Sequence, residues 1–293
     1  MPRRHRQSPQ RPLLSLPLHD KAIRFGPLAG RLWTENKARL IENYIKGFQI
    51  ITKHGTYIDG FAAPQANAVT SSWAAKRVLS LNPLRLRHFH LFDRTDRTSF
   101  LDELKSTHPN IDIRVYGGDF NRRIHEVLRE DIISNREATF CLLDQWTNEC
   151  DWSTVRAIAR HKSSEHKIEL FYFLAVGWLH RVLLSSTTAD SLKRIEAWYG
   201  GAGWESLAEL STYQLSEHFR LRFQSELGYR FVFPWAIYER SDPDSRVMFY
   251  MIHASDHPRA PKLMEAAYAE VVVDVPKPER RLPLPDPAEP TGS

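Results

Sequence analysis

Residues Thr56 to Gln65 read TYIDGFAAPQ, an apolar run that ends in a carboxylate and a turn of small residues. The run Thr56–Phe61 has the length of a short strand, and the small residues that follow allow the backbone to turn tightly. In open α/β sheets, ligands bind where the strands end, near the switch in strand order. This stretch therefore predicts the first strand of such a sheet, followed by a candidate ligand-binding turn.

Outward from this stretch, candidate helices and strands alternate along the chain. Helical spacing precedes it at Leu32–Gln49, and Ser71 and Ser72 can cap a helix that runs to Leu81. The pattern then predicts strands at Leu86–Phe92, Ile111–Tyr116, Ala138–Leu143 and Ile168–Leu174, with helices at Thr98–His108, Asn121–Ile133 and Trp152–His161. Strands that are apolar on both faces favour a parallel sheet covered by helices on both sides.

The later part of the chain has a different pattern. Strand candidates at Phe231–Tyr238 and Val247–His253 flank the turn sequence Ser241–Ser245 and therefore predict a hairpin. Three helices complete the pattern, at Asp190–Tyr199, Leu207–Leu227 and Pro261–Val272. The whole predicts a Rossmann-like α/β fold with a class I methyltransferase-type sheet. This sheet is mostly parallel with a C-terminal antiparallel hairpin, has the strand order 3-2-1-4-5-7-6, and carries helices on both faces.

Composition bounds the class of protein. We expect a basic tail over residues 1–30, one α/β domain over 31–275 and a Pro-rich tail over 276–293. No apolar run has the roughly 18 residues of a membrane span, and no signal peptide is recognisable, so we expect a cytoplasmic protein without membrane contact. The net charge of +5 favours an anionic partner such as nucleic acid, although charge confined to a tail would carry no such meaning.

Three carboxylates end three successive predicted strands, and we take them as cofactor-binding candidates. Asp59 is positioned for an ammonium group, Asp93 for ribose hydroxyls and Asp119 for an adenine amino group. Gly60, Phe61 and Phe120 adjoin them and complete this candidate set. The structural alternative is that each carboxylate caps backbone amides of a turn or helix.

The fourth predicted strand ends in Asp144, followed by Trp146. These two residues are the catalytic candidates: Asp144 to hold a target amine and Trp146 to stack on a base, with burial of Trp146 in the core as the alternative.

Other reactive groups give weaker signals. Cys150 lies between two acids, which disfavours a nucleophilic thiolate, and Cys141 has the setting of a core residue. His180 and Arg181 follow the fifth strand and either contact a phosphate or belong to an amphipathic helix. The histidines show no metal-ligand spacing, so no metal is expected.

These motifs resemble the three-Cys-motif partner protein family. The resemblance rests on Tyr-Ile-Asp-Gly-Phe-Ala at 57–62, Leu-Phe-Asp at 91–93, Gly-Asp-Phe-Asn at 118–121, the stretch at 144–152 and the segment at 249–260. It implies a bacterial protein with a methyltransferase-like fold that is encoded beside a phage-type protein with a three-cysteine motif, its possible partner. Asp59, Gly60, Asp93, Asp119 and Asp144 match the family's motif positions. In place of the family's usual Ala-Gly-Pro-Gly and Asp-Pro, this chain has Ala62-Ala63-Pro64-Gln65 and Asp144-Gln145.

Two functional hypotheses follow. The first is an S-adenosylmethionine-dependent methyltransferase-like protein that acts on or binds nucleic acid, with a flipped base as a candidate target, in phage or mobile-element biology. The second is a non-catalytic adaptor on a degenerate methyltransferase fold that works with a partner protein, which the altered cofactor loop favours. A metal-dependent nuclease or hydrolase has no supporting ligand cluster in the sequence.

Overall fold

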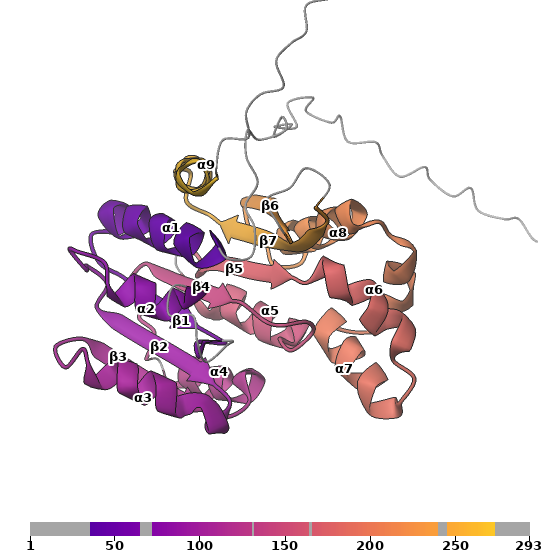
Figure 1. The fold of residues 1–293 in the computed structure, drawn as a ribbon, viewed down its shortest axis with the longest axis horizontal. Helices are drawn as coiled ribbons and strands as arrows, with labels where there is room; N and C mark the ends of the chain where they lie inside the picture. Colours follow the sequence, from indigo (N-terminus) through magenta and orange to yellow (C-terminus); the bar gives the residue numbers. More distant parts are fainter. Residues whose placement is uncertain (1–35, 65–71, 131, 164–165, 240–244, 273–293) are drawn as a thin grey trace, which may run out of the picture.

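The computed structural model describes residues 36–64, 72–130, 132–163, 166–239 and 245–272. They form a mixed α/β fold around one seven-stranded sheet of order β3-β2-β1-β4-β5-β7-β6 (Figure 1). The strands are β1 Thr56–Asp59, β2 His88–Asp93, β3 Asp112–Gly117, β4 Thr139–Leu143, β5 Glu169–Leu174, β6 Phe231–Tyr238 and β7 Val247–Ser255. The predicted strand order is confirmed. The predicted tails, 1–30 and 276–293, lie outside the described residues.

Strands β1 to β5 pair in parallel, and β7 is antiparallel to both β5 and β6. The predicted hairpin of β6 and β7 is therefore confirmed, although residues 240–244 of its turn lie outside the described residues. The strand order reverses between β1, which pairs with β2, and β4, which pairs with β5. A sheet of this kind has its ligand-binding crevice at that reversal, outside the carboxyl ends of the strands.

The predicted helices are present, α5 with the expected bounds and the others with shifted ends. They are α1 Lys37–Thr52, α2 Ala74–Leu79, η3 Thr95–Arg97, α3 Thr98–Ser106, α4 Phe120–Arg129, α5 Trp152–His161, α6 Val176–Ser185, α7 Ala189–Tyr199, η4 Trp204–Glu209, α8 Thr212–Ser225 and α9 Ala260–Val271.

Two helix predictions need correction. The single helix predicted over Leu207–Leu227 is wrong: η4 ends at Glu209, and α8 starts anew because Ser211 and Gln214 form a capping box. At α2, the N-cap residue is Trp73, whose own side chain makes no capping hydrogen bond, and the helix ends at Leu79 and not at Leu81; of the two predicted caps, Ser71 lies outside the described residues.

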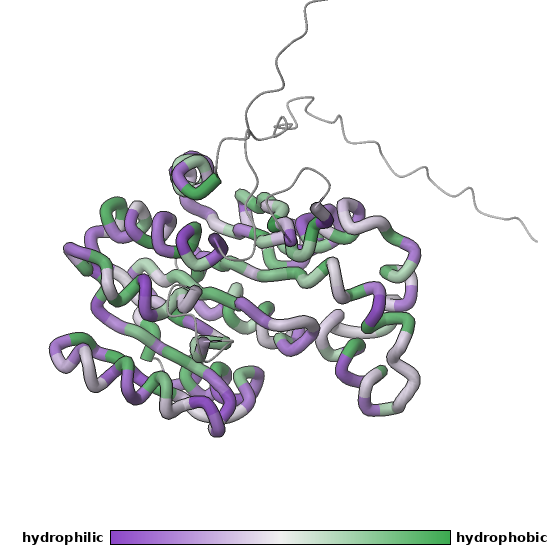
Figure 2. The backbone as a smooth tube through the Cα atoms, in the orientation of Figure 1, coloured by the Kyte–Doolittle hydropathy of each residue, from purple (hydrophilic) through white to green (hydrophobic). Residues whose placement is uncertain are grey.

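Each face of the sheet has its own apolar core. On one face, Ile58, Cys141 and Leu170 pack with α4, α5, α7 and α8, and on the other Tyr57, Phe140 and Phe171 pack with α1, α2, α3 and α9. The alternation arises because successive side chains of a strand point to opposite faces. Figure 2 shows the hydrophobic colour concentrated along the central strands, as expected for a sheet covered on both sides. Within the described residues, no helix has the length and apolarity needed to cross a membrane.

Candidate functional site

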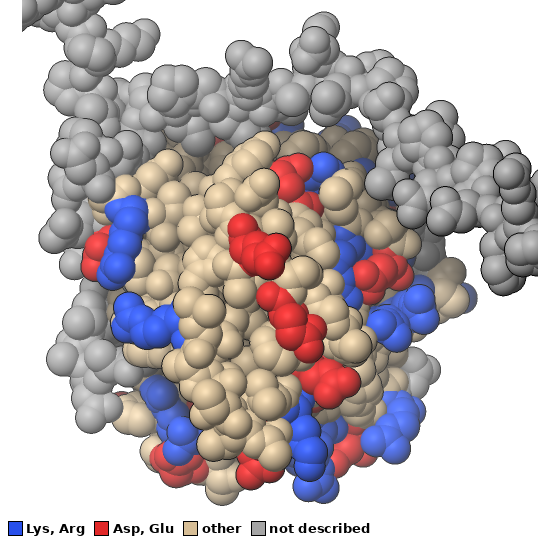
Figure 3. Space-filling model, turned by 90° about the vertical axis from the view of Figure 1, so that its right-hand side faces the viewer, with Lys and Arg blue, Asp and Glu red and all other residues tan. Residues whose placement is uncertain are grey.

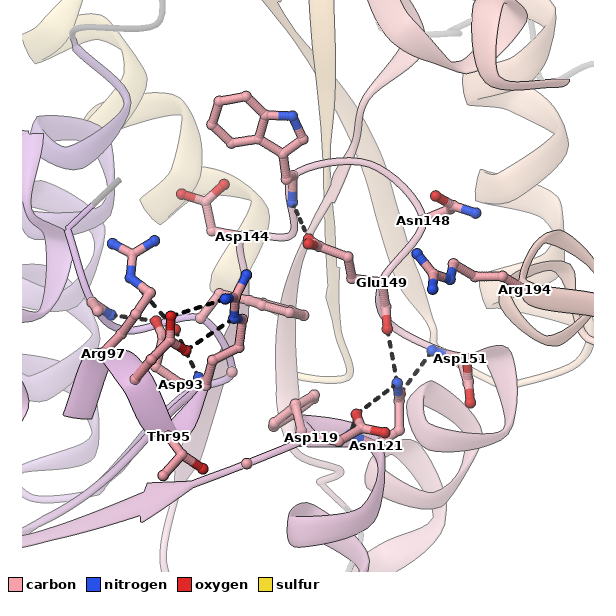
Figure 4. Close-up of a pocket in the computed structure, with 18 residues that line it drawn as sticks. Asp93, Thr95, Arg97, Asp119, Asn121, Asp144, Asn148, Glu149, Asp151 and Arg194 are labelled. Atoms are coloured by element: carbon pink, nitrogen blue, oxygen red, sulfur yellow. Dashed lines mark hydrogen bonds and ion pairs between the residues drawn. The ribbon is translucent and has the colours of Figure 1, made fainter. Parts of the chain in front are cut away.

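A cavity of about 860 Å³ opens at the carboxyl edge of the sheet, beside the reversal of strand order. Segments that follow β1, β2, β3 and β4 line it, together with Arg194 from α7 (Figure 4). Of the eight predicted site residues, seven line this cavity: Gly60, Phe61, Asp93, Asp119, Phe120, Asp144 and Trp146. The eighth, Asp59, is not among the described residues that line the cavity, because its side chain is buried in the protein interior.

Asp59 is held by its own turn. Its carboxylate accepts hydrogen bonds from the Tyr57 hydroxyl at 3.0 Å and from the backbone N–H of Phe61 at 3.2 Å, and the residue is 2% exposed. The contact with Phe61 agrees with the predicted alternative, in which the carboxylate binds a backbone amide of the turn. A direct contact between Asp59 and a cofactor ammonium group stays a prediction.

Burial raises the pKa of Asp59 to about 7, although the hydrogen bond from Phe61 acts in the opposite direction. Between pH 4 and 7 the folded protein thus binds more protons at this site than the unfolded chain, so stability falls as pH rises through that window.

Replacing Asp59 with asparagine is expected to remove this pH dependence. At pH 8 the variant should be more stable than the parent by about 1–3 kcal/mol, and at pH 4.5 the difference should largely disappear. Urea unfolding at the two pH values measures this, with Asp102→Asn on the exposed face of α3 as the matched control. Parallel pH profiles for parent and variant would contradict the assignment.

Gly60 is favoured by close packing in the lining of the cavity. A Cβ atom at this position would lie 3.0 Å from the Phe120 ring and 3.2 Å from Leu143. The Phe61 ring lies 5.6 Å from the Phe120 ring, and Phe120 also packs edge-on against Phe92. The candidates Phe61 and Phe120 therefore form an apolar wall, which is suited to the flat face of a base or ring.

Asp93 ends β2, and its carboxylate connects the segment after β2 to the segment after β1. One of its oxygens accepts from the backbone N–H of Ala63 at 2.8 Å, and the other accepts from the N–H of Arg94 at 2.8 Å. Arg97 approaches the second oxygen at 3.8 Å (Figure 4). Burial raises the pKa of Asp93, opposed by these hydrogen bonds and by Arg97. The alternative in which a carboxylate binds the backbone amides of a turn therefore describes Asp93, but the expected cap on the following helix is not formed, because η3 and α3 begin without a side-chain cap from their N-cap residues Arg94 and Arg97.

Asp119 caps α4, as the alternative interpretation proposed. Its Oδ1 accepts from the backbone N–H of Asn121 at 3.0 Å while the side chain borders the cavity. Asn121 then connects this turn to the segment after β4: it donates to the Glu149 carbonyl and accepts from the Asp151 N–H, each at 2.8 Å (Figure 4). Asn121 was visible in the quoted motif, but only the fold reveals this connection.

Asp144 and Trp146 both line the cavity, but they differ in solvent exposure and in their contacts. The Oδ1 atom of Asp144 accepts from Lys37 Nζ at 2.7 Å, and this ammonium also lies 4.8 Å from the centre of the Phe173 ring. Trp146 is 57% exposed, so the alternative in which it is a core residue is wrong. An exposed indole beside a cavity is available to stack on a planar ligand.

Gln145 shapes the segment that carries these two residues. Its side chain is fully buried, accepts from the backbone N–H groups of Glu149 and Cys150, and donates to the Phe173 carbonyl. The loop is therefore folded by amide hydrogen bonds where the resembled family commonly has proline. Glu149 in turn accepts from the Trp146 N–H at 2.7 Å, which fixes the backbone beneath the indole.

The remaining sequence candidates lie away from the cavity. His180 and Arg181 belong to α6, where His180 contacts the Leu210 carbonyl at 2.7 Å and Arg181 stacks on Trp178. Both cysteines are buried, and burial raises their pKa well above the ordinary value, so neither is a poised nucleophile. The described residues contain no cluster of three or more groups that could hold a metal ion.

Sequence reasoning missed four basic residues at this site. Arg94 and Arg97 line the cavity after β2, Arg194 reaches it from α7, and Lys37 pairs with Asp144 from 107 positions away. No local pattern marks Lys37 or Arg194, because only the tertiary fold brings their helices to this edge.

The chain was also compared with known proteins. It matches no protein-family model and no curated protein.

Proposed function

We propose that the chain is an S-adenosylmethionine-dependent methyltransferase-like protein that acts on or binds nucleic acid, with the 860 Å³ cavity as its cofactor site. One observation carries the proposal: carboxylates that end β2, β3 and β4 converge on one cavity at the reversal of strand order. The observed order is the one expected of a class I methyltransferase sheet. Resemblance to the three-Cys-motif partner protein family points the same way.

The charge of the lining suits this ligand. Six carboxylates face three arginines around the cavity: Asp93, Asp96, Asp119, Asp144, Glu149 and Asp151, against Arg94, Arg97 and Arg194. A net negative lining attracts the sulfonium and ammonium groups of S-adenosylmethionine. Asp93 is placed for ribose hydroxyls, Asp119 for the adenine amino group, and the wall of Phe61 and Phe120 for the adenine face.

Catalysis at such a site depends on positioning. S-adenosylmethionine would supply the methyl group. Asp144 and Trp146 lie at the mouth, where a carboxylate oxygen can accept from a target amine while the exposed indole stacks on its base.

The nucleic-acid part of the proposal rests on charge. The excess of seven basic over two acidic residues within 1–35 equals the net charge of the chain: Arg3, Arg4, Arg6, Arg11, Lys21, Arg24 and Arg31, against Asp20 and Glu35. This segment joins the described fold at Asn36, next to the Lys37 that contacts Asp144. By contrast, Figure 3 shows a face with acidic groups near its centre and basic groups towards its margins, which does not favour a polyanion.

The decisive experiment is calorimetric titration with S-adenosylmethionine and S-adenosylhomocysteine. We expect micromolar binding by the parent chain and at least a tenfold loss, about 1.4 kcal/mol, in Asp93→Asn, because that substitution removes the charge and one acceptor from the ribose site. Asp102→Asn, on the exposed face of α3, is the matched control and should bind like the parent.

The second candidate function is the non-catalytic adaptor with a partner protein. The Lys37–Asp144 ion pair favours it, since it engages the carboxylate that a methyltransferase would offer to an amine. The adaptor predicts no binding of either nucleoside by a well-folded sample. That outcome would overturn the enzyme proposal and direct the work to partner capture.

A further inference from the structure

A second cavity, of about 580 Å³, lies at the opposite edge of the sheet. It is bordered by the starts of β4 and β5, the end of β7, and the helices α1 and α9. Because β7 runs antiparallel to β5, Ser255 at its end lies beside Glu169 at the start of β5. This cavity is therefore separated from the candidate cofactor site by the length of the strands.

The cavity contains a buried cation, Lys162, that forms no ion pair within the part of the chain that the structure describes. Lys162, just after α5, is 7% exposed, and its Nζ donates to the backbone carbonyl of Glu137. Among the described residues, no carboxylate lies within ion-pair distance of this amine. Burial lowers the pKa of Lys162 to about 8, although the charge of Glu137 acts in the opposite direction. A buried ammonium of this kind is costly unless an anion accompanies it.

The three carboxylates of the cavity have partners of their own. Glu137 accepts from Thr56 Oγ1 at 2.8 Å and from His54 at 3.1 Å. Glu169 accepts from Tyr44 and Ser255.

Asp256, the third, accepts from the Lys167 side chain at 3.1 Å and from the Arg230 N–H at 3.0 Å. The acids thus have partners within the protein, whereas the buried Lys162 ammonium has no carboxylate of the described residues within ion-pair distance.

The rest of the lining includes both basic and apolar groups. The ring centroids of His166 and His257 lie 5.4 Å apart, and Arg136 lines the same cavity. His257 accepts from the Arg259 N–H at 3.2 Å through Nδ1, so its Nε2 carries the proton and is a donor. Ile51 of α1 and Leu263 of α9 supply hydrocarbon surface.

We propose that this cavity binds a small organic acid, whose carboxylate pairs with Lys162 and whose hydrocarbon body packs against Ile51 and Leu263. A volume of 580 Å³ falls within the range of small-molecule sites. The proposal is independent of the cofactor site, because it uses none of the residues that line the first cavity.

Calorimetry with 4-methylpentanoate and its neutral amide tests the proposal. The acid should bind with a Kd below about 1 mM, and the amide at least tenfold more weakly. Lys162→Met keeps an unbranched side chain that is one atom shorter and removes its charge, so it should lose at least tenfold in affinity for the acid. Lys105→Met, on the exposed face of α3, is the matched control and should bind like the parent. Equal binding of acid and amide, no binding of the acid, or an unchanged Lys162→Met would each overturn the proposal.

A second measurement uses the unmodified chain, so its result does not depend on whether the Lys162→Met variant folds normally. Backbone amide shifts in a titration with 4-methylpentanoate should change around Ala138 and Ala260, which line the second cavity, and stay unchanged around Gly118. Changes confined to the surroundings of Gly118 would place the acid in the first cavity and overturn the proposal.

Discussion

Replacing Trp152 with alanine is expected to lower the free energy of unfolding by about 3–5 kcal/mol. Trp152 opens α5 and is fully buried, with its ring edge-on to Phe223 at 5.5 Å and covered by the Arg222 guanidinium at 4.0 Å. Its indole N–H donates to Glu226 at 2.7 Å. The substitution thus removes a large apolar volume, a cation–π contact and a half-buried hydrogen bond together.

Close packing around this indole limits how far the site can collapse. Gly200 adopts a φ of 94°, and a Cβ there would lie only 2.6 Å from the Trp152 side chain. The cavity left by the substitution should therefore persist, which places the loss towards the upper part of the range.

Denaturant unfolding measures the loss, and a second tryptophan provides the control. Trp146→Ala is the same chemical change at a residue that is 57% exposed, and we expect it to change stability by less than about 0.5 kcal/mol. Equal losses for the two variants would show that the burial assigned to Trp152 is wrong.

Replacing Gln145 with methionine is expected to cost about 2–5 kcal/mol, although the side chain keeps its size. The variant leaves the N–H groups of Glu149 and Cys150 and the carbonyl of Phe173 without their present partners. Buried backbone groups that lose a hydrogen bond cost about 1–3 kcal/mol each, reduced where the loop relaxes towards water.

Two measurements check this prediction. Denaturant unfolding gives the change in stability, and amide hydrogen exchange at Glu149 and Cys150 should become markedly faster in the variant. Gln224→Met is the matched control, because Gln224 on α8 accepts only a half-buried side-chain hydrogen bond from Arg220. Unchanged exchange at Glu149 and Cys150 would show that Gln145 does not hold the loop.

The pattern of the sequence predicted most of the fold. Short apolar runs, separated by helical patterns and turns, predicted the positions of all seven strands of the described sheet. The bounds of α5 and β6 agree with the prediction residue for residue. The reason is that strands buried on both faces require continuous apolar sequence, and turn residues separate them clearly. The division between η4 and α8 was missed, because a capping box inside a continuous helical pattern is a small signal.

The candidate site was predicted in part. A carboxylate at the end of a parallel strand must lie at one edge of the sheet, so Asp93, Asp119 and Asp144 could be placed together from spacing. Their individual contacts could not. Burial of Asp59 and exposure of Trp146 depend on which elements cover them, and local sequence carries little of that information.

By itself, the sequence determined the strand order and the edge of the sheet at which the acidic residues gather, because periodicity and connection rules act over neighbouring elements. Only the tertiary structure decided which groups meet across long separations. It brought Lys37 to Asp144, closed the Gln145 loop, and left Lys162 buried in a second cavity without a counter-ion among the described residues. Such contacts arise from the packing of whole helices against the sheet, which no short stretch of sequence encodes.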